Sequence, residues 1–233
     1  IDGSKFSKAA VDFIASRTTL IGGSPEVELL NVQLPIPVRA ARVVGKAVVK
    51  SYYEDESGRV LKPALAALKK AGLEATSAYA VGHPGEQIAA AADRDKADLI
   101  VMGSHGHGAL AGLILGSTTN AVLAHTKKPI LVLRARQAPQ GDSLKVGIAV
   151  DGSKYGREAV RYVIRHRDLF GPAPHIVLMH VVADFAGAVM PDMAGIAMPA
   201  FTEDEIKAMQ KKTFDAALDP VRKLLDKEGL TAE

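Results

Sequence analysis

Five glycines separate a short apolar run from a helix-like sequence, and their spacing suggests phosphate chemistry. The wider pattern is Gly103-x2-Gly106-x9-Gly116-Ser117. Glycine adopts positive φ angles and lets the backbone approach a ligand closely. The first N–H groups of a helix have no intrahelical partner and favour an anion, and Ser117 is expected to cap this helix. The segment therefore predicts two sets of backbone donors around a polyphosphate, with Thr118 among them.

Two other phosphate-binding loops fit these glycines poorly. A Walker A loop needs a lysine directly after its last glycine, and Ser117 stands there instead. A dinucleotide fingerprint is nominally present as Gly106-x-Gly108-x-x-Ala111, but it follows the fourth expected strand, and no acidic residue lies about 20 residues later. A further alternative stays open, in which the glycines only allow a helix to pack tightly against a sheet.

Apolar runs alternate with helical patterns over the first half of the chain. This alternation predicts a parallel sheet with right-handed crossovers and helices on both faces, which is an α/β fold. Gly72 is expected to end one helix, and Pro84 is expected in the first turn of the next. Counting a first strand that is cut short at residue 1, strands two to five are expected at 27–32, 73–81, 98–102 and 129–134. The expected helices include 54–71, 83–96 and one that starts at residues 116–117.

Three blocks of sequence recur in the same order along the chain. The matching pairs are 1–14 with 150–163, 25–32 with 174–181, and 61–73 with 218–230. A period of about 150 residues is the size of a domain, so the pattern predicts a tandem duplication.

The duplication predicts a first domain over residues 1–134, a linker over 135–143 and a second domain over 144–233. The second copy enters through an apolar strand, whereas the first copy begins inside the corresponding strand. The second copy also lacks a counterpart of the glycine-rich segment. Adding the missing pieces of each repeat gives an expected full length of about 290–300 residues.

Composition and charge exclude several classes of function. The 233 residues are 48% hydrophobic and 24% charged, with a net charge of +3. The basic residues are spread out, so we expect no nucleic-acid partner. No apolar run reaches the roughly 18 residues that a membrane-spanning helix needs, so we expect no membrane partner. The absence of cysteine excludes disulfides and thiol chemistry, and it suits a cytoplasmic location.

The glycine spacing and its context resemble the signature of the universal stress protein family. The motif Gly103-x2-Gly106-x9-Gly116-Ser117 is preceded by LIVM and followed by PILVL, and Asp-Gly-Ser opens both repeats. The resemblance covers essentially the whole chain and points to the tandem-domain, ATP-binding members. It implies two Rossmann-like domains, each with a five-stranded parallel sheet of strand order 3-2-1-4-5, the second being incomplete in this chain.

The resemblance also implies roles for individual residues. The ligand would be ATP, alone or with Mg²⁺, bound where the first and fourth strands end. Asp2 would accept hydrogen bonds from the ribose, with an N-cap of the first helix as the equal alternative. The other implied contacts are Val32 at the adenine, Met102 and Gly103 along the ribose and phosphate path, and Gly106, Gly116, Ser117 and Thr118 at the phosphates. In the second repeat, Asp151 and Val181 match a possible half-site.

The sequence holds little that would hydrolyse a nucleotide. Residues 103–125 contain no acid, lysine or arginine, and an ATPase needs such groups. His105 and His107 are spaced like metal ligands, but no third ligand lies nearby, so we predict neither a metal site nor a catalytic residue. We expect a nucleotide-dependent regulatory or stress-response protein with at most weak ATP hydrolysis. The alternatives are an adenylating or pyrophosphate-releasing enzyme on a related α/β scaffold, and a nucleotide-free interaction module.

The apolar run at residues 129–134 is expected to form an edge strand. An unpaired edge of this kind invites pairing with another strand. In the family this strand often pairs across a domain or subunit interface. The resemblance therefore implies either intramolecular pairing of the two domains or a homodimer, together with protein partners that the sequence does not identify.

Overall fold

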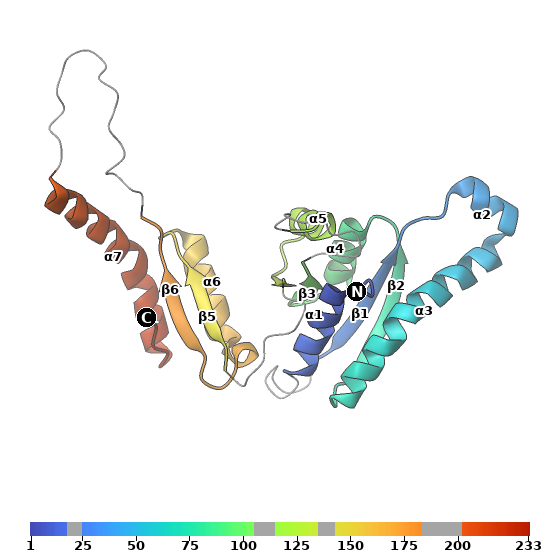
Figure 1. Ribbon diagram of the computed structural model, residues 1–233, viewed down its shortest axis with the longest axis horizontal. Helices are drawn as coiled ribbons and strands as arrows, with labels where there is room; N and C mark the ends of the chain where they lie inside the picture. Colours follow the sequence, from blue (N-terminus) through green and yellow to red (C-terminus); the bar gives the residue numbers. More distant parts are fainter. Residues whose placement is uncertain (18–24, 105–114, 135–142, 183–201) are drawn as a thin grey trace, which may run out of the picture. The chain divides into compact units, whose positions relative to one another are not determined.

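The computed structural model describes residues 1–17, 25–104, 115–134, 143–182 and 202–233 (Figure 1). The chain divides into two compact units, Ile1–Gln140 and Gly141–Glu233. Each unit combines parallel strands with helices, so the predicted α/β fold with parallel strands is confirmed. The finer domain and linker limits expected from the repeat remain a prediction.

Unit 1 contains two pairs of parallel strands. One pair is β1 (Val27–Gln33) with β2 (Ala75–Val81), and the other is β3 (Ile100–Gly103) with β4 (Ile130–Leu133). All four overlap the apolar runs that predict strands. Because the described residues form two-stranded sheets, the five-stranded sheet and its order 3-2-1-4-5 remain predictions.

Helices account for most of the remaining described residues of unit 1. They are α1 (Lys5–Ala15), α2 (Val38–Val44), α3 (Lys46–Lys70), α4 (Pro84–Arg94) and α5 (Ser117–His125). Gly72 follows α3 with a φ of +83°, in the left-handed region that glycine adopts without strain, so it ends this helix as predicted. No helix in the described part of the chain is long and apolar enough to cross a membrane.

Helix α3 begins earlier than its sequence pattern predicts. The prediction starts it at residue 54, yet α3 begins at Lys46, and α2 precedes it. Val44 and Val48 weakened the helical signal in this part of the sequence, because β-branched residues are weak helix formers and these two valines are exposed to solvent. Tyr53 anchors the early turns, since its hydroxyl accepts the Ile36 N–H at 2.7 Å just beyond β1.

Helices lie on both faces of β1. Leu29 of β1 belongs to a core cluster with Val11 of α1 and Leu68 of α3. The neighbouring residue Glu28 forms an ion pair with Arg94 of α4, with 3.3 Å between nitrogen and oxygen. Because successive strand residues point to opposite faces, α1 and α3 cover one face of β1 and α4 covers the other (Figure 1).

Helices α4 and α5 pack closely together beside β3. Gly85 of α4 faces Ala121 of α5 so closely that an added Cβ would lie 2.4 Å from the Ala121 Cβ. Ala92 of α4, Ile100 of β3 and Val122 of α5 form a second core cluster. This packing holds the start of α5 near the end of β3, which are the two ends of the glycine-rich segment.

The described residues of unit 2 form one parallel strand pair and two long helices. These elements are β5 (Lys145–Ala149), α6 (Lys154–Arg165), β6 (His175–Met179) and α7 (Glu203–Lys227), with a short 3-10 helix, η1, at Arg167–Phe170. Their shared core cluster includes Ile148, Val160, Ile176, Leu178, Leu218 and Leu225. Helix α6 and strand β6 lie where the predicted repeat matches α1 and β1; the duplication itself remains a prediction.

Replacing Leu68 by alanine should destabilise unit 1. Leu68 is 1% exposed in the core between α3 and β1. Truncating a fully buried leucine leaves a cavity and costs roughly 2–5 kcal/mol, so the free energy of unfolding in urea, followed by circular dichroism, should fall by that amount. Leu123→Ala is the control, because Leu123 is 48% exposed. Equal losses in the two variants would contradict this core.

Candidate functional site

A tight turn just before α1 orients Asp2. Gly3 has a φ of +80°, and Ser4 is the N-cap of α1, with its hydroxyl accepting the Ser7 N–H at 3.2 Å. Asp2 Oδ1 in turn accepts the Ser4 N–H at 3.0 Å. The alternative that Asp2 is the N-cap of α1 is therefore wrong. Ser4 is the N-cap, and Asp2 holds Ser4 in place through its hydrogen bond.

Asp2 places an ionised carboxylate at the start of α1. Burial acts to raise the pKa of Asp2, but hydrogen bonds from Ser4 and Ser7 outweigh this effect, and the pKa lies below its ordinary value. A helix N-terminus also favours a negative charge. The carboxylate is therefore ionised at neutral pH and suited to accept hydrogen bonds from the hydroxyl groups of a ligand.

The first turns of α1 lie directly against the end of β3. A Cβ added at Gly103 would lie 2.6 Å from the Phe6 Cβ and 2.7 Å from the Phe6 carbonyl carbon. No side chain fits in this space, so tight packing explains this particular glycine by itself. The same contact brings the N-terminus of α1 to the carboxyl end of β3.

Buried hydrogen bonds tie the start of α5 to the same strand end. The Gly116 N–H donates to the Ser104 carbonyl oxygen at 2.7 Å. The Thr119 hydroxyl lies 3.3 Å from the carbonyl oxygens of Gly103 and Ser104 and donates toward them. Ser104 and Thr119 are 0% and 1% exposed, so this junction is closed to water.

The N-cap of α5 is Gly116, and Ser117 is the first residue of the helix. This corrects the expectation that Ser117 would cap. Gly116 has a φ of −70° and a ψ of 158°, an extended conformation that any residue adopts, so the backbone does not require glycine there. The N–H groups of Ser117, Thr118 and Thr119 occupy the first turn, where an α-helix supplies no acceptor. Ser117 and Thr118 are not buried, so their N–H groups are the donors that α5 offers to an anion, whereas Thr119 is 1% exposed.

A buried asparagine in β1 holds the segment that precedes α1. Asn31 is 3% exposed, and its Nδ2 donates to the Ile1 carbonyl oxygen at 2.7 Å. Its Oδ1 accepts from Gln33 Nε2 at 2.6 Å. The sequence analysis did not identify Asn31 as a functional residue. A single amide side chain within an apolar strand was the signal that could have identified it. Through Asn31, the end of β1 with Val32 lies beside the segment that carries Asp2.

The structure brings most of the predicted contact residues to one region of unit 1. Asp2 precedes α1, Gly103 ends β3 against α1, Met102 packs against the cluster of α4 and α5, and Gly116 begins α5 beside the strand end. Gly106 lies outside the described residues. The arrangement juxtaposes one carboxylate with the N-termini of two helices, and it can therefore hold a ligand that has both hydroxyl groups and negative charge.

The start of α6 in unit 2 repeats the turn before α1. Gly152 has a φ of +80°, and Asp151 Oδ1 accepts the Ser153 N–H at 2.9 Å. Hydrogen bonds from Ser153 hold the pKa of Asp151 below its ordinary value. Val181, which is 90% exposed, follows β6. Asp151 and Val181 thus follow two adjacent parallel strands, and their use as a half-site remains a prediction.

A histidine takes the place of Asn31 in unit 2. His180 lies 149 residues after Asn31, and its Nδ1 is 2.7 Å from the Val150 carbonyl oxygen. Because a carbonyl oxygen only accepts, Nδ1 carries the proton. Asn31 bonds to the carbonyl of Ile1 in the same way, so both side chains tie a strand to the segment before a helix.

No group of three or more histidine, aspartate or glutamate side chains positioned to hold a metal occurs among the residues described. His105 and His107 lie outside those residues.

Gly103→Ala should destabilise unit 1 in the absence of any ligand. The added methyl group would overlap the backbone of Phe6, and overpacking of this kind costs roughly 1–3 kcal/mol in the free energy of unfolding. Gly58→Ala is the matched control, because a Cβ there would meet only the flexible Lys62 side chain at 3.6 Å. Urea denaturation of the two variants measures the difference, and unchanged stability of Gly103→Ala would contradict the contact between α1 and β3.

Comparison with known proteins places this chain in a family. The model of the universal stress protein family matches residues 1–134. Universal stress protein YxiE of Bacillus subtilis is 30% identical over 142 residues, which cover 58% of this chain and 95% of that protein.

Other relatives are matched over less of their length. A universal stress protein of Methanocaldococcus jannaschii is 35% identical over 71 residues, and the match covers 30% of this chain and 44% of that protein. One from Synechocystis is 40% identical over 67 residues, or 23% of its length, so the chain matches less than half of these two relatives.

Solved structures of the same family share the fold. A universal stress protein from Archaeoglobus fulgidus matches with a TM-score of 0.58 and 19% identity, over 96% of this chain and 71% of that chain. Universal stress proteins in complex with cAMP and with dAMP match over 57% and 56% of this chain, at 26% and 21% identity and TM-scores of 0.39 and 0.42. Because the family model spans more than half of the chain and the Bacillus relative is matched over nearly its full length, this chain belongs to the universal stress protein family.

Proposed function

We propose that unit 1 binds an adenine nucleotide, ATP, where α1 and α5 begin beside the end of β3. One observation carries this proposal: two helix N-termini converge on Gly103 and Ser104. Phe6 makes the contact from α1, and Gly116 and Thr119 make it from α5. N–H groups at a helix start attract phosphate. The glycine spacing that resembles the ATP-binding members of the family joins these same elements.

The chemical groups in this region fit the parts of a nucleotide. The N–H groups of Ser117 and Thr118 would donate to phosphate oxygens, and a helix N-terminus contributes roughly 0.3–1 kcal/mol toward an exposed anion. The carboxylate of Asp2 would accept from the ribose hydroxyls. The backbone of Val32 would contact the adenine, while Met102 would pack beside the ribose.

The proposal also includes the glycines at the two ends of the glycine-rich segment and a second half-site in unit 2. Gly106 and Gly116 would let the backbone approach the phosphates from both ends of the glycine-rich segment. Asp151 and Val181 would supply the ribose and adenine contacts of a second half-site in unit 2, in the positions that Asp2 and Val32 have in unit 1.

We infer a regulatory role with at most weak hydrolysis. Asp2 is the one carboxylate among the proposed contacts of unit 1, and its Oδ1 already accepts the Ser4 N–H. Residues 103–125 contribute no acid, lysine or arginine that could orient water or stabilise a transferring phosphoryl group. Mg²⁺ would be held jointly by the phosphates and Asp2. The bound nucleotide would alter a surface that partner proteins read, in the cytoplasm.

We also infer that β4 pairs with a further strand, either from a second domain of the same chain or in a homodimer. Along one edge β4 pairs with β3, and no other strand partner for β4 occurs among the described residues. Its residues are apolar, which makes an open edge prone to pairing. The layout of domain 1–134, linker 135–143 and domain 144–233 belongs to this proposal.

Acid release of bound nucleotide tests the proposal. Protein purified without added ligand is denatured in acid, and the supernatant is analysed by chromatography. We expect ATP from the unaltered chain. Gly116→Val should lower the amount at least about tenfold, because its side chain would crowd the first N–H groups of α5, and a tenfold loss corresponds to about 1.4 kcal/mol of binding free energy. The extended backbone at Gly116 tolerates valine, so this variant should still fold.

Gly58→Val is the matched control. A side chain there would meet only Lys62, so the released nucleotide should equal that of the unaltered protein. If neither protein releases a nucleotide and calorimetry detects no binding of added ATP, the proposal is wrong, and the glycine-rich segment serves packing alone.

A further inference from the structure

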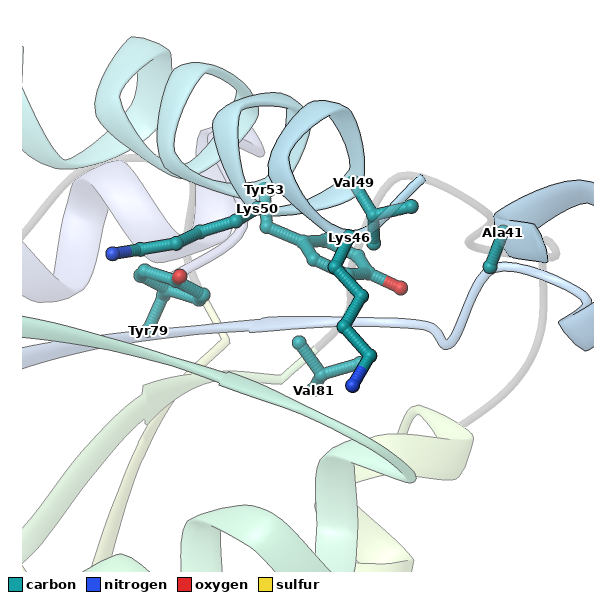
Figure 2. A pocket seen from close by; sticks show the side chains of 7 residues that line it. All are labelled: Ala41, Lys46, Val49, Lys50, Tyr53, Tyr79 and Val81. Carbon is teal, nitrogen blue, oxygen red and sulfur yellow. The ribbon is translucent and has the colours of Figure 1, made fainter. Parts of the chain in front are cut away.

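We propose that a pocket between α3 and β2 binds a small anion that carries a planar apolar group, such as an aromatic carboxylate. The pocket has a volume of about 250 Å³. Figure 2 shows its lining, in which side chains of α3 face those of β2. The lining residues that matter here are Lys46, Val49, Lys50 and Tyr53 of α3 with Tyr79 and Val81 of β2.

Two tyrosines form a preformed aromatic wall. The ring centroids of Tyr53 and Tyr79 are 6.5 Å apart, with their planes inclined by 29°. Tyr53 is 8% exposed, and the Ile36 N–H bonds to its hydroxyl at 2.7 Å, which fixes the ring. Tyr79 lies opposite Asn31 in the ladder between β1 and β2. Because the Tyr53 ring is already held, a flat ligand would bind without the cost of ordering it.

Two lysines extend from α3 over this wall. Figure 2 shows Lys50 above the ring of Tyr79 and Lys46 directed toward Val81. Both lysines are exposed, so their ammonium groups are accessible from solvent. Lys46 makes no ion pair within the described part of the chain, and Lys50 lies 3.6 Å from Glu54.

The local charge selects an anion as the ligand. Residues 34–53 include four basic residues and no acidic one, and the pocket lining itself contains no carboxylate. The side chains of Lys50 and Glu54 are 72% and 51% exposed, and ion pairs this exposed contribute little to stability. A ligand carboxylate can therefore replace Glu54 at Lys50, and Lys46 adds a second positive charge to the lining.

The volume and the apolar wall select a small, flat ligand. Pockets for drug-sized molecules measure roughly 300–1,000 Å³, so a volume below that range suits one ring or two fused rings. The ring would pack against Tyr79 and Val81, and its carboxylate would face Lys50, while Lys46 adds positive charge at the side of Val81.

This pocket shares no residue with the proposed nucleotide site. Its residues come from α2, α3 and β2, whereas the nucleotide proposal rests on α1, β1, β3 and α5. A variant of one site therefore replaces no residue of the other.

Titration calorimetry of the whole chain with 2-naphthoate tests the proposal. We expect saturable binding that weakens as sodium chloride is added, because salt screens exposed charges. The neutral analogue 2-naphthamide should bind about tenfold more weakly, and so should 2-naphthoate to the variant with Lys46→Met and Lys50→Met. Methionine keeps the apolar stem and removes the charge. Val81→Glu, which adds a carboxylate to the pocket, should also weaken binding.

Lys69→Met with Lys70→Met is the matched control, because these exposed lysines lie at the far end of the same helix. This control and Gly116→Val should leave the Kd for 2-naphthoate unchanged, which separates this pocket from the nucleotide site. The proposal is overturned if 2-naphthoate does not bind, if 2-naphthamide binds equally well, or if the two lysine double variants lose affinity to the same degree.

Discussion

The contact between Phe6 of α1 and Gly103 at the end of β3 is the constraint on which the candidate site depends. Any side chain at position 103 would overlap the Phe6 backbone and push α1 away from the strand. Asp2 would move with α1. The start of α5 is tied to the same strand end through Thr119 and Gly116, so α1 and α5 both begin beside the end of β3. A packing requirement at Gly103 thus contributes to the place where two helix N-termini lie at one strand end.

Much of this arrangement could be predicted from the sequence, because it depends on local patterns. Apolar runs located β1 to β4, and Gly72 and Pro84 marked a helix end and a helix start where the structure has them. The glycine spacing and the Asp-Gly-Ser turn pointed to the residues that lie around the end of β3. The Asp-Gly-Ser signal was strong because Gly3 has a positive φ angle and Ser4 caps α1, whereas Gly103 is required by its close packing against Phe6.

What could not be predicted depends on contacts distant in sequence or on backbone conformation. Asn31 acts by reaching the carbonyl of Ile1, thirty positions earlier, and no local pattern encodes that bond. Residue type favoured Ser117 as the cap of α5, but the extended conformation of Gly116 makes glycine the cap. The early turns of α3 escaped prediction because they are held by Tyr53 against the segment after β1, not by an amphipathic pattern. The pocket between α3 and β2 is lined by residues of these early turns, so the sequence did not predict it either.

An amide NMR titration of the chain with ATP tests the central claim most directly. If two helix N-termini hold the nucleotide, the amide signals of Ser117, Thr118 and Thr119 should shift most and saturate together with those around Asp2, since each N–H would donate to or lie beside a phosphate or ribose oxygen. A saturable response confined to other residues, with these amides unmoved, would contradict the account.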